Sequence, residues 1–156
     1  MSYVIAGEEE MLNLGRVLAG CLNGGALITM KGNLGAGKTV FCRGVLRGLG
    51  YEGKVKSPTF TLVEPYELNW GQIFHFDLYR LSDPDELEYI GIEDYLQGEH
   101  LCLVEWPERG LGSLPRADVS VEIEITGDER IVQCRGETTE GQRICHCLNE
   151  AMTRSG

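Results

Sequence analysis

Gly32-Asn33-Leu34-Gly35-Ala36-Gly37-Lys38-Thr39 is the stretch of this sequence that decides the fold. Its spacing is that of a phosphate-binding loop, in which a glycine and any four residues precede Gly-Lys and a serine or threonine. Glycines let the backbone turn tightly around a polyphosphate, so that successive N–H groups and the N-terminus of the next helix face its oxygens. The nucleotide-binding residues predicted from this pattern are Asn33, Leu34, Gly35, Ala36, Gly37, Lys38, Thr39 and Val40.

Two side chains of this loop have distinct expected roles. Lys38 should reach the β and γ phosphates, and the hydroxyl of Thr39 should be a ligand to Mg²⁺. The apolar residues 26–30 predict a strand before the loop, and apolar residues at helical spacing over 40–49 predict a helix after it. Strand, loop and helix in this order are the arrangement in which the motif binds phosphate.

The length and charge of the chain limit what it does. Its 156 residues predict one domain, 1–156, large enough to bury a core. The net charge of −10 argues against this chain being the main nucleic-acid binder of any system. Residues 31–56 carry six basic side chains and one acidic one, which suits phosphate, whereas residues 64–108 carry twelve acidic side chains and one basic one. The acidic stretch suits a metal or a basic partner, although solvated surface charge explains most of these residues.

The cysteines and the N-terminus bear on the compartment. The six cysteines stand mostly singly within apolar stretches, which predicts buried free thiols and a reducing compartment. Cys145-His146-Cys147 is spaced too closely for a usual zinc pair and is expected on a helix. The first six residues have no basic start and no long apolar run, so we expect neither a signal peptide nor a membrane span. The predicted location is cytoplasmic, without membrane association.

The segment after the first helix contains candidate switch residues. Pro58 and the hydroxyls beside it predict a fixed loop, and the alternation over 60–66 together with residues 72–79 predicts a hairpin. Many nucleotide hydrolases sense the γ-phosphate through hydroxyls on the loop after this helix, which makes Ser57, Thr59 and Thr61 the candidates. A plain connecting loop is the alternative.

Two carboxylates are placed where open α/β sheets bind their ligands, at the carboxyl ends of strands. Asp77 ends the second strand of the predicted hairpin, and Glu105 follows the apolar strand 101–104. We expect both to support Mg²⁺ together with Thr39, and Lys38, Asp77 and Glu105 are the catalytic candidates. A turn-capping role for Asp77 is the alternative, and His75 and Trp106 are expected to pack.

The remaining pattern completes the fold prediction. Helices are predicted over 7–24, from a capping box at Asp83-Pro84-Asp85-Glu86, over 90–96 and after Gly141, and strands over 118–125 and 131–135. The predicted fold class is α/β, a P-loop NTPase with a mixed central sheet flanked by helices.

Four blocks of the sequence resemble a known family, the small bacterial ATPases of tRNA threonylcarbamoyladenosine biosynthesis called TsaE or YjeE. The blocks are 32–39, 56–64, 75–81 and 103–108. The resemblance covers most of the chain but little of its last third. Phe60 stands where relatives often have tyrosine, and Asn33 where many have an acid.

The resemblance implies an ATP-binding subunit with weak Mg²⁺-dependent hydrolysis. It would act beside the transferase and its scaffold partner, which attach threonylcarbamoyl to adenosine 37 of tRNA, and would meet tRNA mainly through that complex. In the family's pattern Lys38 and Thr39 hold phosphate and magnesium, Asp77 and Glu105 support the metal site, and the Ser-Pro-Thr block resembles a nucleotide-sensing switch.

Two other functions fit the same motif. In the first, ATP orders residues 57–66 for docking to a partner and hydrolysis is incidental. The second is a small-molecule kinase, which needs several arginines over the acceptor, whereas residues 64–108 supply only Arg80. A GTPase is disfavoured because the chain has no Asn-Lys-x-Asp guanine signature.

Overall fold

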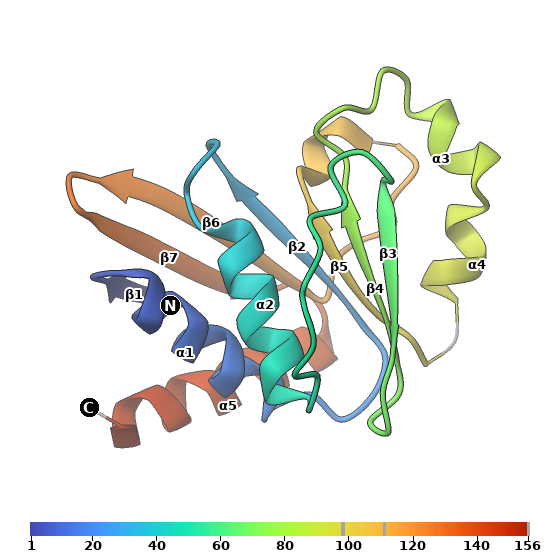
Figure 1. Ribbon diagram of the computed structural model, residues 1–156. Coiled ribbons are helices and arrows are strands. Elements are labelled where there is room, and N and C mark those ends of the chain that lie inside the picture. The colour runs from blue at the N-terminus through green and yellow to red at the C-terminus, as the bar shows by residue number, and fades with distance from the viewer. Residues whose placement is uncertain (98, 111, 156) are drawn as a thin grey trace.

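A mixed seven-stranded sheet forms the centre of the molecule (Figure 1). The structure is a computed structural model that describes residues 1–97, 99–110 and 112–155. The strands are β1 (Ser2–Ile5), β2 (Ala26–Gly32), β3 (Val63–Glu67), β4 (Gln72–Asp77), β5 (Leu101–Glu105), β6 (Val119–Thr126) and β7 (Glu129–Gly136). The helices are α1 (Glu8–Ala19), α2 (Lys38–Gly48), α3 (Asp85–Tyr89), α4 (Ile92–Leu96) and α5 (Thr139–Ser155), with a 3₁₀ turn η1 (Pro107–Gly110). The predicted α/β class with a mixed sheet flanked by helices is therefore confirmed.

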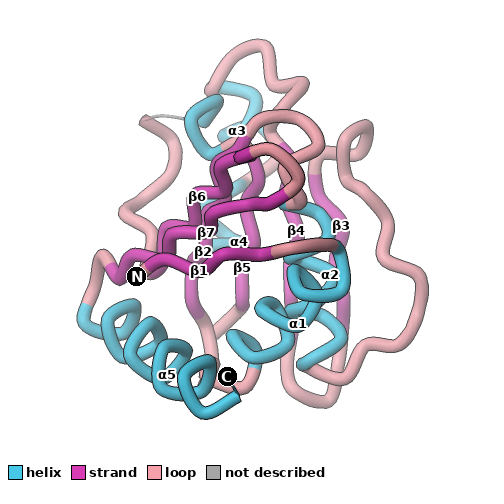
Figure 2. Tube along the Cα trace, turned by 90° about the vertical axis from the view of Figure 1, so that its left-hand side faces the viewer, coloured by secondary structure: helices cyan, strands magenta, loops and turns pink. Residues whose placement is uncertain are grey.

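The strand order is β1-β7-β6-β2-β5-β4-β3. The four central strands β6, β2, β5 and β4 run parallel to one another, and the antiparallel pairs β1–β7, β6–β7 and β3–β4 lie toward the edges. Figure 2 views the sheet from the β1 side, with α3 and α4 toward its far end. Because β2, β5 and β4 are parallel, their carboxyl ends meet at one edge, where the loop after β2 also lies.

Apolar packing divides the sheet into two faces. On one face, Ile28, Met30 and Leu103 pack with the apolar stripes of α1 and α2. On the other face, Cys102 and Val104 pack with residues of α3 and α4. Since side chains alternate along a strand, Glu105 shares the face of Leu103, and Glu105 is paired with Met30 on β2 and with Asp77 on β4. Both carboxylates therefore face the side of the sheet that α2 covers.

Glycines let α1 and α2 approach closely. A Cβ added to Gly44 would lie 2.3 Å from the carbonyl oxygen of Leu12, and one added to Gly15 would lie 2.4 Å from that of Phe41. No side chain fits at these distances, so the two helices pack backbone against backbone. This contact fixes α2, whose first residues belong to the glycine-rich loop, against the rest of the molecule.

Three local predictions were wrong in detail. The predicted first hairpin strand, 60–66, begins only at Val63, because residues 58–61 form a turn in which the N–H of Leu62 bonds the carbonyl of Pro58 at 2.8 Å. The second strand ends at Asp77 and not at 79. The capping box at residues 83–86 is absent: α3 begins at Asp85, and the Asp83 carboxylate instead accepts the N–H of Asp85 at 2.9 Å.

The prediction of six free thiols was also wrong. Cys21, just beyond α1, is joined by a disulfide to Cys147 of α5. The two cysteines are 126 positions apart, so their spacing in the sequence gave no sign that the helices would bring them together. Cys42, Cys102, Cys134 and Cys145 are free and buried. Cysteine usage consequently no longer supports a reducing compartment.

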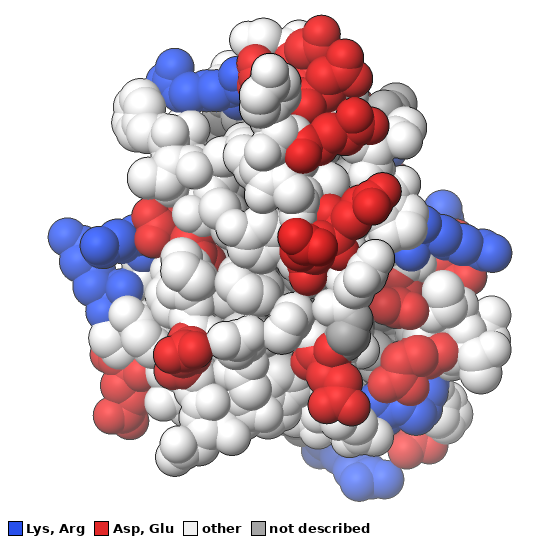
Figure 3. Space-filling view, turned by 90° about the vertical axis from the view of Figure 1, so that its right-hand side faces the viewer, with Lys and Arg blue, Asp and Glu red and all other residues white. Residues whose placement is uncertain are grey.

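The surface charges follow the expected asymmetry. On the face of the molecule viewed in Figure 3, carboxylates are spread over the surface while basic side chains lie at its margins. Within the described ranges, each helix is too short or too polar to cross a lipid bilayer.

Candidate functional site

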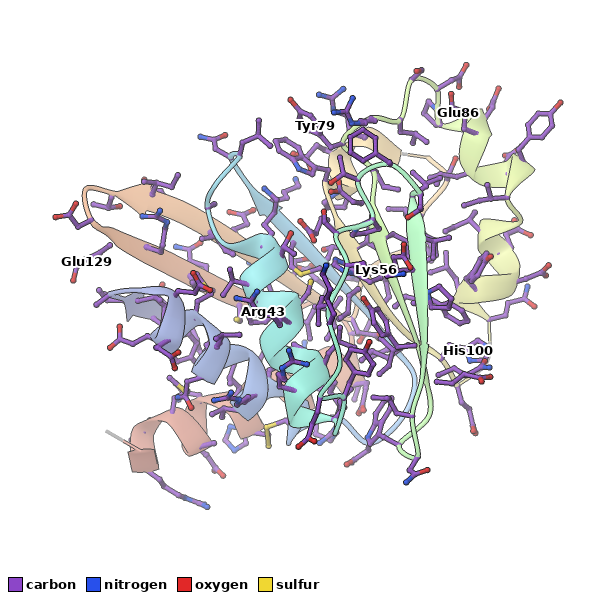
Figure 4. All side chains as sticks on the ribbon, viewed as in Figure 1. Arg43, Lys56, Tyr79, Glu86, His100 and Glu129 are labelled. Carbon is purple, nitrogen blue, oxygen red and sulfur yellow. A yellow bond between two sulfur atoms is a disulfide. The ribbon has the colours of Figure 1, made fainter. Side chains whose placement is uncertain are left out.

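A cavity of about 500 Å³ lies at the edge of the sheet where β2, β4 and β5 end. Its wall combines residues 34–40 of the glycine-rich loop and the start of α2 with side chains from three later segments. Those later residues are Ser57, Thr59, Asp77, Tyr79, Arg80, Glu105 and Trp106. Figure 4 labels Tyr79, which lies near the top of the view, beyond the end of β4. The cavity thus gathers groups that are up to 72 positions apart in the sequence, from Leu34 to Trp106.

The loop itself has the conformation that its glycines permit. Gly35 and Gly37 have φ values of +80° and +112°, a region that side chains disfavour, and Gly37 directly precedes the first turn of α2. No residue among Leu34 to Gly37 extends a polar side chain into the turn. The backbone N–H groups at this helix N-terminus are therefore the natural binding groups for an anion.

Lys38 is held at the base of the loop. Its side chain is buried, and its Nζ donates to the carbonyl oxygens of Gly32 and Asn33, the latter at 3.1 Å. The same ammonium lies 4.3 Å from the ring centroid of Trp106. Burial lowers the pKa of Lys38, and the nearby carboxylates of Glu105 and Asp77 partly oppose that effect.

Glu105 is the best-connected acid of the site. Its side chain is almost completely buried, and its two oxygens lie 3.1 and 3.0 Å from the hydroxyl of Thr39. Its Oε2 also lies 2.6 Å from Nε2 of His75, which is fully buried. A carboxylate at this depth is stable only when such partners are present. The contacts fix Glu105 beside the hydroxyl of the glycine-rich loop.

Asp77 connects the sheet to the predicted switch. Its Oδ2 accepts a hydrogen bond from the Thr59 hydroxyl at 3.1 Å, and Thr59 in turn lies 2.8 Å from the hydroxyl of Ser57. Its Oδ1 accepts the backbone N–H of Tyr79 at 3.0 Å. Asp77 therefore forms the turn contact considered as an alternative, while its other oxygen faces the loop hydroxyls.

Most of the sequence-predicted residues meet in this cavity, but two do not line it. Thr61 instead hydrogen-bonds Glu64 at 3.0 Å, and Asn33 contributes its carbonyl oxygen to Lys38 and to the N–H of Ala36. The roles of the residues that do meet there remain predictions.

Four residues at or beside the cavity were not among the predicted site residues. His75 and Trp106 were expected only to pack, yet His75 bonds Glu105 and Trp106 lies under Lys38. Tyr79 and Arg80 line the cavity, and the guanidinium of Arg80 lies 4.6 Å from the ring of Phe60. For His75 the available signal was its position two residues before Asp77, which places both side chains on one face of β4.

The donor set fits a hard cation beside a polyphosphate. Thr39 offers a hydroxyl, and Glu105 and Asp77 offer carboxylates on paired residues of adjacent strands. Mg²⁺ prefers oxygen ligands of this kind and shares its coordination with phosphate oxygens and water. The residues present therefore fit a magnesium ion bound together with a nucleotide.

The site lies where a strand, a glycine-rich loop and a helix follow one another, and it contains lysine, hydroxyl and carboxylate groups. This combination defines the class of protein: an α/β protein with the strand–loop–helix arrangement of a phosphate-binding loop. The family described as "Threonylcarbamoyl adenosine biosynthesis protein TsaE" matches residues 5–133. The chain therefore belongs to the TsaE family, whose membership implies a P-loop.

Individual relatives of the chain carry the same family name. The chain is 44% identical over 149 residues to the tRNA threonylcarbamoyladenosine biosynthesis protein TsaE of Haemophilus influenzae, covering 92% of this chain and 94% of that protein. It is 36% identical over 121 residues to the Bacillus subtilis protein of the same name, covering 78% of this chain and 75% of that one. A crystal structure of Bacillus subtilis YdiB superimposes with a TM-score of 0.79 at 27% identity, covering 97% of this chain and 95% of that one.

We predict that His75→Ala lowers the free energy of unfolding by about 2–4 kcal/mol, because it opens a cavity and removes a partner from a buried carboxylate. Urea unfolding followed by circular dichroism measures this change. His146→Ala is the matched control, since the His146 side chain is 72% exposed on α5 and its removal should cost little. Equal stability of the two variants would show that the His75–Glu105 contact contributes nothing.

Proposed function

We propose that this chain is a Mg²⁺-dependent ATP-binding subunit that hydrolyses ATP weakly and serves threonylcarbamoylation of adenosine 37 in tRNA. The observation that carries the proposal is the contact between Thr39, the hydroxyl of the glycine-rich loop, and Glu105, the buried acid that ends β5. In nucleotide hydrolases these two groups hold the metal that bridges the phosphates. Membership of the TsaE family supports the proposal that the process is this tRNA modification.

Each site residue has a role that its position supports. Amides of residues 33–40 bind the phosphates, and Lys38 neutralises charge that develops on the β and γ groups. For this role the Lys38 ammonium exchanges the carbonyls of Gly32 and Asn33 for phosphate oxygens. Thr39, Glu105 and Asp77 hold Mg²⁺, directly or through its water ligands. When bound, Mg²⁺ supplies positive charge that stabilises the phosphoryl group during transfer.

Residues 57–61 form the proposed nucleotide-sensing turn. The hydroxyl of Thr59 donates a hydrogen bond to Asp77. A ligand that changes the contacts of Asp77 would therefore change the position of this turn. Phe60, in the same turn, is 85% exposed and lies over Arg80, a cavity-lining residue. Movement of the turn would therefore alter the surface that the protein presents to its partners.

We propose that those partners are the transferase subunit and its scaffold, that this chain meets tRNA mainly through their complex, and that the process takes place in the cytoplasm. The net charge of −10 supports the indirect contact with tRNA, since the phosphate backbone is repelled by a protein of like charge. ATP hydrolysis would reset the complex after each round.

Replacement of Lys38 or Thr39 by alanine tests the catalytic assignment. We expect each variant to hydrolyse ATP about 10²–10³-fold more slowly than wild type, as loss of one preorganised charge-stabilising group does in other enzymes. The Lys54→Ala variant is the control, because Lys54 is an exposed cation outside the cavity. Phosphate release at wild-type rates by both Lys38→Ala and Thr39→Ala would remove this site from consideration.

A non-hydrolysable ATP analogue separates hydrolysis from simple nucleotide-controlled docking. In a reconstituted modification reaction with limiting amounts of this chain, we expect the analogue to support a single round per molecule and ATP to support many. Modified tRNA is counted against the amount of this chain. If the analogue sustains repeated rounds, the protein is a binding module and hydrolysis is not part of its function.

A further inference from the structure

A second set of potential ligand groups lies behind the cavity. The thiol of Cys42, an imidazole nitrogen of His75 and a carboxylate oxygen of Glu105 all lie within 4.8 Å of one another. They come from α2, β4 and β5. Cys42 is one helical turn after Thr39, and His75 is two residues before Asp77, so the fold that builds the cavity also brings these three groups together.

The cluster is buried and has unused binding capacity. Cys42 and His75 are completely inaccessible, and Glu105 is 2% exposed. Nδ1 of His75 is buried and has no hydrogen-bond partner among the described residues. The Cys42 thiol has a weak partner, the sulfur of Met30 at 3.1 Å. A buried imidazole nitrogen without a partner is rare, and it indicates a group that another ligand would complete.

The chemistry of the three groups identifies the ligand. Thiolate sulfur, imidazole nitrogen and carboxylate oxygen together are the donors that bind Zn²⁺, whereas Mg²⁺ takes oxygen ligands. Three protein ligands leave a further position, and Glu105 borders the cavity from which a small ion enters.

We propose that Cys42, His75 and Glu105 form a zinc-binding site that is distinct from the magnesium site and shares one carboxylate with it. Because the thiolate is the form that binds metal, coordination releases the proton of the Cys42 thiol to solvent. A zinc ion that takes the Glu105 carboxylate withdraws it from Thr39, so zinc binding antagonises magnesium binding. The zinc site stands without the proposed ATPase function, whereas its inhibitory effect rests on that function.

Cobalt substitution tests the site directly, without nucleotide. Co²⁺ added to the wild-type protein should produce the near-ultraviolet absorption of a thiolate–cobalt bond, and Zn²⁺ should abolish it. Cys42→Ser should lack this absorption. Cys102→Ser should retain it, because Cys102 is an equally buried free thiol on the opposite face of the sheet. Absence of the band in wild type, or its persistence in Cys42→Ser, would overturn the proposal. If Cys42→Ser fails to fold, alkylation of the wild-type thiols located by mass spectrometry decides instead: Zn²⁺ should protect Cys42 and leave Cys102 unchanged, and equal alkylation of Cys42 with and without Zn²⁺ would overturn the proposal.

Zinc inhibition of ATP hydrolysis, measured at saturating Mg²⁺ and relative to each protein's own rate, tests the antagonism. Wild type and Cys102→Ser should reach half-inhibition at a Zn²⁺ concentration about tenfold or more below that for Cys42→Ser. Identical zinc sensitivity of the three proteins would refute the antagonism. If the chain proves not to hydrolyse ATP, the cobalt spectrum still decides on the site, so failure of the two proposals is distinguishable.

Discussion

The buried carboxylate of Glu105 is the constraint on which the candidate site depends. A charged group that is 2% exposed has to be satisfied by fixed partners, and here they are the hydroxyl of Thr39 and the imidazole of His75. Those partners come from the helix after the glycine-rich loop and from the neighbouring strand. One acid therefore fixes the loop, α2, β4 and β5 relative to one another, and the rest of the sheet and the close α1–α2 packing support that arrangement.

The same arrangement explains how the site could respond to a nucleotide. Asp77 is paired with Glu105 across β4 and β5, and it contacts the turn that carries Thr59. A metal ion bound by Asp77 would thus be connected to the exposed turn over 58–61 through one hydrogen bond, that between Asp77 and Thr59. This short connection is what a switch requires, because a ligand acts on a conformational equilibrium only through contacts that differ between the states.

Much of this could be predicted from the sequence. The strand before the glycine-rich loop and the helix after it were predicted from the motif, because its glycines, lysine and threonine are tied to one backbone geometry. Asp77 and Glu105 were placed correctly at the ends of parallel strands, because apolar runs that end in an acid are read directly from the chain. The predicted hairpin corresponds to the antiparallel pair β3–β4, and the strands predicted over 118–125 and 131–135 correspond to the antiparallel pair β6–β7.

Features that depend on long-range packing were not predictable in this way. The role of His75 depends on the register between β4 and β5, and the Cys21–Cys147 disulfide depends on how α5 packs beside α1. Trp106 was assigned to packing since nothing in its neighbourhood indicates that Lys38 lies over its ring. Pro58 was correctly predicted to lie in a loop, but the predicted strand began at Phe60 because the alternation over 60–66 includes it, whereas the turn continues to residue 61 and β3 begins at Val63.

The central claim is that Glu105 and Thr39 hold a magnesium ion that joins the nucleotide to the sheet. Its most direct measurement is the affinity for ATP by calorimetry, with and without Mg²⁺, for wild type, Glu105→Gln and the exposed control Glu52→Gln. The account predicts that Mg²⁺ strengthens ATP binding about tenfold or more in wild type and in the control, and that Glu105→Gln loses this gain. An undiminished gain in Glu105→Gln would contradict the account.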